Sequence, residues 1–164
     1  MLRISKKADY AVFLLGCIAR QGAFPGGAAE DSVVSAHEIA RQASLNKSVV
    51  ANLLKVFARD GLLDSVRGLK GGYRLARAPQ DVTLGQILEA VDGPFTLVDC
   101  LKPAGAAAAG DDHQCSLIGF CPTKNPMRIV HDRISRLFDD ITLAELCGLT
   151  ACAGNPVSFA ATPR

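Results

Sequence analysis

Residues 58–75 read ARDGLLDSVRGLKGGYRL, and this stretch decides how the chain folds. Two short runs that favour strands, Leu63–Val66 and Tyr73–Ala76, flank a glycine-rich turn. Because glycine adopts backbone angles that other residues avoid, the turn predicts a tight β-hairpin. Gly61 is a typical helix stop, so a helix is expected to end just before the hairpin.

Two helices are predicted upstream of this hairpin. Ser35 and Glu38 have the spacing of a capping box, which indicates a short helix to about Ala43. A tight turn follows, and either Asn46 or Ser48 can cap a second helix that runs up to the helix stop. Helix, turn, helix and hairpin in this order predict a winged helix-turn-helix, an architecture that reads DNA.

The second of these helices has two faces of different chemistry. The apolar face consists of Val50, Leu53, Leu54 and Phe57, and the polar face consists of Ser48, Asn52, Lys55 and Arg59. The apolar face predicts a core contact, whereas the polar face can bond base edges and phosphates. Ser48 and Asn52 lie nearest the helix start and are expected to meet bases. Lys55 and Arg59 lie further along and are expected to meet phosphates, although an ordinary solvated face would share this pattern.

The hairpin favours the DNA interpretation, because its tip is small and basic. A glycine tip lets two backbones approach closely, and an arginine there can enter a minor groove. The predicted contacts from the hairpin are Arg67, Lys70, Gly71, Gly72, Tyr73 and Arg74. Charge agrees, since residues 1–80 hold 12 Lys and Arg against 6 Asp and Glu, whereas residues 81–164 hold 6 against 10. A basic half joined to an acidic half predicts a polyanionic partner for the first half.

Three further helices are expected around this unit. An amphipathic helix covers residues 5–20, and the Thr83 and Gln86 pair opens another helix to about Val91. A long helix over residues 124–140 carries an apolar seam of residues spaced three and four apart. The seam consists of Met127, Val130, Ile134, Leu137 and Ile141. A lone helix with one apolar seam needs a partner, so a homodimer is expected, with packing on its own domain as the alternative.

The fold class that follows is mainly α with a small β-hairpin wing: a winged helix-turn-helix plus a long C-terminal dimerisation helix. Residues 1–80 are the predicted DNA-binding domain. Residues 81–146 are predicted to hold a linker helix, a cysteine loop and the dimerisation helix, and residues 147–164 a disordered tail. The apolar runs are too short for a bilayer and no signal-peptide layout is present, so we expect a cytoplasmic protein with no membrane partner.

Three cysteines, Cys100, Cys115 and Cys121, fall in one predicted loop. Fourteen residues separate the first two and five separate the second pair. In the cytosol such thiols suit metal or redox chemistry better than disulfides. Three thiolates can hold an iron–sulfur cluster and leave one position for another ligand. Zinc with the nearby His113, or a thiol switch without metal, would use the same residues.

No motif predicts an enzyme. The glycine-rich turn lies between strands rather than before a helix, so it is no phosphate loop, and no catalytic side chains have a recognisable spacing. We therefore expect no catalytic residue and no small-molecule substrate. The histidines His37, His113 and His131 are scattered and expected to face solvent; Cys17 is expected in the core, and Cys147 and Cys152 fit no metal-like pattern. An adaptor whose winged helix binds protein instead of DNA is an alternative.

Three segments, residues 1–11, 58–75 and 141–146, resemble the iron–sulfur winged-helix regulators of the IscR, NsrR and RirA type. The chain is most similar to the branch that regulates Suf cluster assembly, which shares a Gly-Pro-x-x-Leu-x-x-Cys pattern like residues 93–100. The resemblance implies a homodimer on double-stranded operator DNA and an iron–sulfur cluster, either 2Fe–2S or 4Fe–4S. We therefore expect a repressor that senses cluster or redox status, with a cluster-free thiol sensor as the alternative.

The resemblance also implies that Cys100, Cys115 and Cys121 hold the cluster. Some family members take the fourth ligand from a His three residues after the last cysteine, but that position here is Lys124. Others use an acidic residue from the first helix of the partner subunit, and Asp9 falls at that position. Asp9 is therefore the predicted fourth ligand, although an acid near a helix start is also favoured by the helix dipole.

Overall fold

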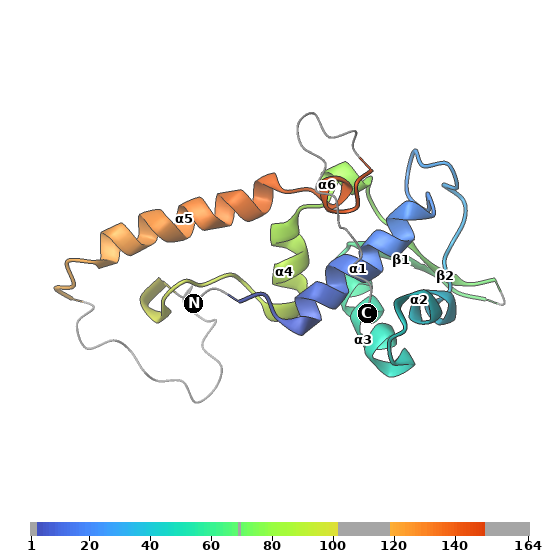
Figure 1. Ribbon diagram of the computed structural model, residues 1–164, viewed down its shortest axis with the longest axis horizontal. Coiled ribbons are helices and arrows are strands. Elements are labelled where there is room, and N and C mark those ends of the chain that lie inside the picture. The colour runs from blue at the N-terminus through green and yellow to red at the C-terminus, as the bar shows by residue number, and fades with distance from the viewer. Residues whose placement is uncertain (1–2, 69, 102–118, 150–164) are drawn as a thin grey trace, which may run out of the picture.

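The computed structural model describes residues 3–68, 70–101 and 119–149. Figure 1 shows a body of packed helices with a small hairpin at one end and one long helix, α5, extending from the other. The elements are α1 (Lys6–Arg20), α2 (Ala36–Ala43), α3 (Lys47–Arg59), β1 (Leu63–Val66), β2 (Gly72–Leu75), η1 (Pro79–Asp81), α4 (Leu84–Asp92), η2 (Asp99–Leu101), α5 (Lys124–Asp140) and α6 (Leu143–Leu146). In the described residues, no helix is long and apolar enough to span a bilayer.

Side-chain caps mark where α1, α2, α3 and α4 begin. Ser5, Ser35 and Asn46 each accept a backbone N–H from the first turn of α1, α2 and α3. Thr83 forms the complete capping box that was expected for α4. The box expected at Ser35 is only half formed, because the Glu38 carboxylate accepts from Arg41 and Gln42 instead of from the backbone N–H of Ser35. The ionic partner outcompetes the backbone donor there.

The core joins the helix-turn-helix to elements that follow it in the chain. The predicted apolar face of α3, Val50 with Leu53, Leu54 and Phe57, is buried. Ile87 of α4 and Leu143 of α6 belong to the same apolar cluster. Both α4 and α6 pack directly on α1, so the helix-turn-helix shares its core with these later helices.

The wing is a two-stranded antiparallel hairpin. Leu63 pairs with Leu75 and Val66 pairs with Gly72. Tyr73 also exchanges both backbone hydrogen bonds with Val34, at 2.8 and 2.9 Å, which ties the hairpin to the chain entering α2. The expected fold class, mainly helical with a small hairpin wing, is confirmed by this arrangement.

The end of the described chain contains an element that the sequence analysis omitted. Thr142 and Glu145 form a complete capping box that starts α6. Cys147 follows this short helix and is buried in the core, although its sequence position suggested a tail. Backbone bonds from Cys147 to Leu143 and from Leu149 to Ala144 continue the turn. Residues 150–164 of the expected tail, Cys152 among them, lie outside the described residues.

The long helix α5 packs on α4 and on the segment that follows α4, where aromatic rings meet. Phe138 is its buried residue, and its ring meets Phe95 edge-on at 5.4 Å. His131 also stacks on Phe95, with the two ring centroids 5.2 Å apart. Its Nε2 donates to the Phe95 carbonyl oxygen at 3.0 Å. The expectation that His131 faces solvent is therefore wrong, because a tertiary contact that periodicity cannot reveal half-buries it.

Candidate DNA-binding surface and cysteine loop

The polar face of α3 is presented to solvent along the helix. Asn46 accepts the backbone N–H of Ser48 at 2.8 Å and so fixes the helix start. Ser48, Asn52 and Lys55 are all exposed on the face opposite the core. Within the part of the chain that the structure describes, the side chains of Asn52 and Lys55 have no hydrogen-bond or ionic partner. Their polar groups are therefore available to an external partner.

Arg59, the fourth predicted contact on this face, already has an acidic partner. Its guanidinium donates to both carboxylate oxygens of Asp60, at 2.8 and 3.3 Å. These hydrogen bonds hold the pKa of Asp60 below its ordinary value. Both side chains are exposed, and an exposed ion pair is weak. A phosphate could therefore compete for Arg59, but it would first have to displace Asp60.

The start of α3 exposes an apolar side chain that the sequence analysis did not select. Val49 lies next to Ser48 and is 39% exposed, unlike the buried Val50 that follows it. An apolar side chain at this position can contact the methyl group of thymine. The sequence signal for Val49 is an apolar residue that falls outside the apolar face of the helix.

The tip of the wing carries two cations on a backbone that requires glycine. Arg67 and Lys70 are exposed on either side of the turn. Gly68 has a φ of 125°, which L side chains rarely adopt. A Cβ on Gly71 would lie 2.4 Å from the carbonyl oxygen of Val66, so no larger residue fits there. The turn thus holds Arg67 and Lys70 at the end of a narrow hairpin.

Three other predicted wing contacts point toward the protein. Gly72 is buried, and a Cβ there would lie 2.6 Å from the carbonyl oxygen of Val34. Tyr73 is half-buried and packs against the core. Arg74 lies 3.4 Å from the Asp64 carboxylate on the paired strand and 3.4 Å from the carbonyl oxygen of Glu30. These residues shape the hairpin, whereas Arg67 and Lys70 form its free end.

The described cysteines of the loop are free thiols at its two ends. Cys100 lies in η2 and Cys121 lies just before α5, and both are half-buried. The pKa of Cys121 is lowered, chiefly by a hydrogen bond with the Thr123 hydroxyl at 3.2 Å and also by backbone N–H groups and Lys124. A lowered pKa favours the thiolate, which is the form that binds metal and reacts as a nucleophile. Cys115 and His113 lie outside the described residues.

Asp9, the predicted fourth ligand, lies on another element, α1. It is exposed on the first turn of α1 and lines a cavity with Cys17 and Cys147. No group of three or more His, Cys, Asp and Glu side chains suited to a metal occurs among the residues that the structure describes. A single chain therefore does not bring Asp9 together with Cys100 and Cys121.

The apolar side of α5 is largely uncovered. Leu137 is 56% exposed and Val130 is 40% exposed, while Met127, Ile134 and Ile141 of the predicted seam are half-buried. Ile129, which the predicted seam did not include, is also 54% exposed. Exposed apolar side chains on one helix are typical of a surface that binds another protein or a second copy.

Comparisons with known proteins agree with this architecture. A family model described as Rrf2, iron-dependent transcriptional regulator, matches residues 4–148. The transcriptional regulator IscR of Vibrio atlanticus is 30% identical over 145 residues, which cover 88% of this chain and 75% of that protein. The structure of T. potens IscR is 28% identical with a TM-score of 0.60, covering 90% of this chain and 87% of that one.

A further solved structure shows how widely the fold is shared. CymR of B. subtilis, described as the global cysteine regulator, matches with a TM-score of 0.64 and 24% identity, covering 92% of this chain and 99% of that one. At this identity the match shows the fold alone. The family match spans α1 through α6, including the helix-turn-helix and its wing. The chain therefore belongs to the Rrf2 family and is a helix-turn-helix transcriptional regulator, not an enzyme.

Proposed function

We propose that this regulator is a homodimeric repressor that binds operator DNA and senses an iron–sulfur cluster. The observation that carries the sensing part is the pair of free thiols, Cys100 and Cys121, at the two ends of the loop between α4 and α5. In this scheme residues 1–80 read DNA and residues 81–146 sense and dimerise, in the cytoplasm. The Gly-Pro-x-x-Leu-x-x-Cys pattern of residues 93–100 further supports a role in regulating Suf cluster assembly.

The DNA would be read by α3 and the tip of the wing. Asn52 and Ser48 would bond base edges in the major groove, where Val49 could meet a thymine methyl. Lys55, together with Arg59 once released from Asp60, would neutralise phosphates. The wing would place Arg67 and Lys70 in or along the adjacent minor groove, where a narrow groove attracts cations. Gly71, Gly72, Tyr73 and Arg74 would support the hairpin that carries them.

The chemistry of the loop fits an iron–sulfur cluster. Thiolates are the usual ligands of such clusters, and the lowered pKa of Cys121 favours its thiolate. Cys100, Cys115 and Cys121 would hold the cluster, and the partner subunit's Asp9 would complete its ligand set. When bound, the cluster would supply a group that oxidants and iron shortage can destroy.

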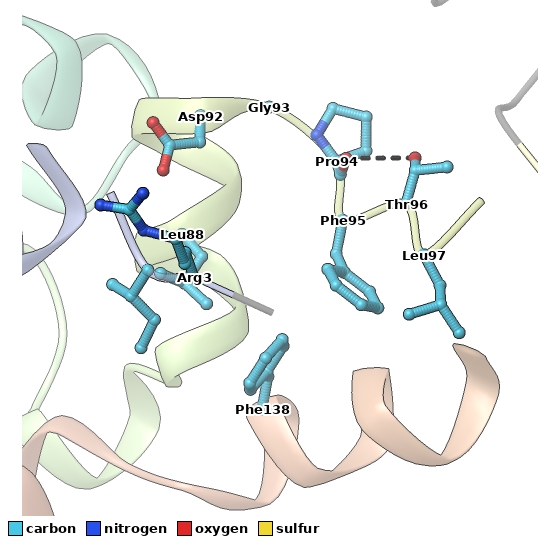
Figure 2. Close-up of a pocket in the computed structure, with 10 residues that line it drawn as sticks. Arg3, Leu88, Asp92, Gly93, Pro94, Phe95, Thr96, Leu97 and Phe138 are labelled. Carbon is cyan, nitrogen blue, oxygen red and sulfur yellow. Dashed lines mark hydrogen bonds between the residues drawn. The ribbon is translucent and has the colours of Figure 1, made fainter. Parts of the chain in front are cut away.

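The Phe95 contact offers a route from the loop to the DNA-reading helix. Phe95 and Phe138 line a pocket of about 360 Å³ together with Leu88 of α4. Figure 2 shows the side chains that line this pocket. Phe95 lies in the short segment that joins α4 to Cys100, and His131 holds its carbonyl oxygen. Since α4 packs on both α1 and α3, a displacement of Cys100 would be passed to the helix-turn-helix through this segment.

The decisive experiment is anaerobic purification followed by iron and sulfide assays and operator binding. We expect a coloured protein with iron and acid-labile sulfide whose operator affinity changes when the cluster is removed. Cys121→Ser should abolish both the cluster and this change, whereas Cys152→Ser should leave both intact. A colourless, iron-free protein whose affinity ignores reconstitution contradicts cluster sensing.

Dimerisation has its own test on the uncovered side of α5. Leu137→Glu places a charge among exposed apolar side chains and should produce a monomer in sedimentation or size-exclusion measurements. Arg128→Glu introduces the same residue at an exposed position on the opposite side of α5 and should remain dimeric. A dimer that survives Leu137→Glu would place the subunit interface elsewhere.

A cluster-free thiol sensor is the second candidate, because the lowered pKa of Cys121 would also favour reaction with an oxidant. The effect of Asp9→Ala and the metal content of the protein distinguish the two candidates. A thiol sensor should respond to oxidants without iron, should need only two of the loop cysteines, and should be indifferent to Asp9→Ala. A cluster sensor should lose or destabilise its cluster in the same variant.

A further inference from the structure

A second pair of thiols, neither of them in the cysteine loop, lines one cavity. Cys17 comes from α1 and Cys147 directly follows α6, yet both line one cavity of about 570 Å³. Cys17 is half-buried and Cys147 is only 9% exposed. The cavity also contains the side chain of Arg20, one turn after Cys17 on α1. None of these three residues has a part in the proposed DNA contacts or cluster ligands.

The packing around Cys147 makes specific room for its sulfur. Gly16 is buried within α1, and a Cβ there would lie 2.9 Å from the Cys147 sulfur. Glycine in the interior of a helix is less favourable than alanine, so this position needs a local reason. The Arg20 guanidinium also donates to the carbonyl oxygen of Cys147 at 3.2 Å. Gly16 and Arg20 together hold Cys147 against α1, where Cys17 lines the same cavity.

Burial favours the protonated form of both thiols. Burial raises the pKa of Cys17 and of Cys147, and Arg20 opposes the shift at both residues. Because oxidants attack the thiolate, protonated thiols in a half-closed cavity are protected from them. A coordinating metal ion deprotonates a thiol outright, so a raised pKa does not exclude metal binding.

We propose that Cys17 and Cys147 form a two-thiolate site for a soft monovalent cation, Cu(I), with Arg20 as its compensating charge. Two S–H bonds break, two sulfur–copper bonds form and two protons leave, while the copper stays Cu(I). Soft thiolates select Cu(I), which two ligands can satisfy, whereas structural zinc almost always takes four. Two thiolates and one Cu(I) leave one negative charge, which the Arg20 guanidinium can balance at this position.

The test uses the full chain in a background that lacks the loop ligands. Cys100→Ser, Cys115→Ser and Cys121→Ser are combined, so that Cys17, Cys147 and Cys152 remain. Under anaerobic conditions this protein should remove one equivalent of Cu(I) from a coloured Cu(I) chelator, and X-ray absorption should show sulfur ligands. Adding Cys17→Ser or Cys147→Ser should abolish the transfer, while adding Cys152→Ser should not.

Two further variants distinguish a lost site from a lost fold. Arg20→Gln keeps both sulfurs and should weaken Cu(I) binding by about tenfold, the scale expected for one nearby compensating charge. Arg20→Lys should restore most of that affinity, and circular dichroism should show all variants folded. Transfer that survives both Cys17→Ser and Cys147→Ser, or a folded background protein that takes no Cu(I), overturns the proposal. Either result leaves the cluster hypothesis untouched, because the background already lacks its ligands.

Discussion

The helix α3 and the helix α5 are both amphipathic, but only α3 has its apolar face covered within one chain. Phe57 of α3 is fully buried, whereas Leu137 of α5 is 56% exposed. The polar face of α3 is left outside a finished core, where it can bind DNA without disturbing the fold. On α5 the apolar side is left outside, and in the proposed scheme the cysteines of the preceding loop supply only part of the cluster's ligand set. In that scheme the DNA-reading half is a completed surface, and the sensing half is a surface that a second copy would complete.

The largest expected effect tests this difference in burial. Phe57→Ala should lower the free energy of unfolding by about 3–5 kcal/mol, because it opens a cavity in the core of the helix-turn-helix. Leu137→Ala should cost much less, and its cost should shrink on dilution, because it acts through association of two copies. Chemical denaturation at several protein concentrations measures both effects. Equal and concentration-independent losses would show that α5 is covered by its own chain.

Base recognition by α3 should give the next largest effect. Asn52 is exposed and without a partner among the described residues, so its loss should leave the fold unchanged. Asn52→Ala should weaken specific operator binding by about 1–3 kcal/mol and relax the preference at one base pair. Titration of the operator and of single-base variants measures this. An unchanged preference at every position would remove Asn52 from base recognition.

Phosphate contact should give a smaller and more uniform effect. Lys55→Gln should weaken binding to all duplexes alike and reduce the salt dependence of affinity by about one counterion. The matched control is Arg128→Gln on α5, which removes an exposed charge far along the chain from the reading helix. DNA affinity measured across a series of salt concentrations distinguishes Lys55→Gln from Arg128→Gln. A salt slope that changes equally in both variants would indicate a general charge effect instead of a contact.

Local signals in the sequence predicted the DNA-reading half well, because its elements begin and end at residues with direct backbone chemistry. Asn46 caps α3, and Gly68 and Gly71 build the turn where they were expected. Outside this half, Thr83 and Gln86 cap α4 as expected. The two faces of α3 followed from helical periodicity alone. These features depend on neighbours within a few residues, which a sequence displays directly.

Most of the features that the sequence did not predict depend on residues far apart in the chain. His131 is half-buried by Phe95, which lies 36 residues before it. Cys147 is buried against α1, where Gly16 leaves room for its sulfur although it lies far away in the sequence. The helix α6 is too short for periodicity, although Thr142 and Glu145 display the capping-box spacing. In the proposed dimer, Asp9 would meet the loop cysteines of a second copy. Residue spacing within one sequence and the structure of one chain cannot test a contact between two copies.

The smallest expected effect compares two capping boxes of the same design. In α4 the third helical residue is Gln86, which does not titrate, and in α6 it is Glu145. The backbone N–H and hydroxyl of Thr142 donate to the Glu145 carboxylate and hold its pKa below the ordinary value. A lowered pKa in the folded state contributes stability that is present above the unfolded pKa and is lost as pH falls through the folded pKa.

Glu145→Gln should therefore remove a small acid-labile part of the stability while keeping the hydrogen bond to the Thr142 backbone. Thermal unfolding midpoints can be measured from neutral pH down into the pH range in which carboxyl groups titrate. The midpoints of the wild type and of Glu145→Gln should converge as the pH falls. Glu145→Ala, which also loses the hydrogen bond, should stay less stable than Glu145→Gln at every pH, while Gln86→Ala should be destabilised by the same amount across the range. A gap between wild type and Glu145→Gln that does not change with pH would show that this carboxylate contributes no titrating stability. In that event the α6 cap, like the α4 cap, stabilises its helix through hydrogen bonding alone, and Cys147 is held against α1 equally well in acid.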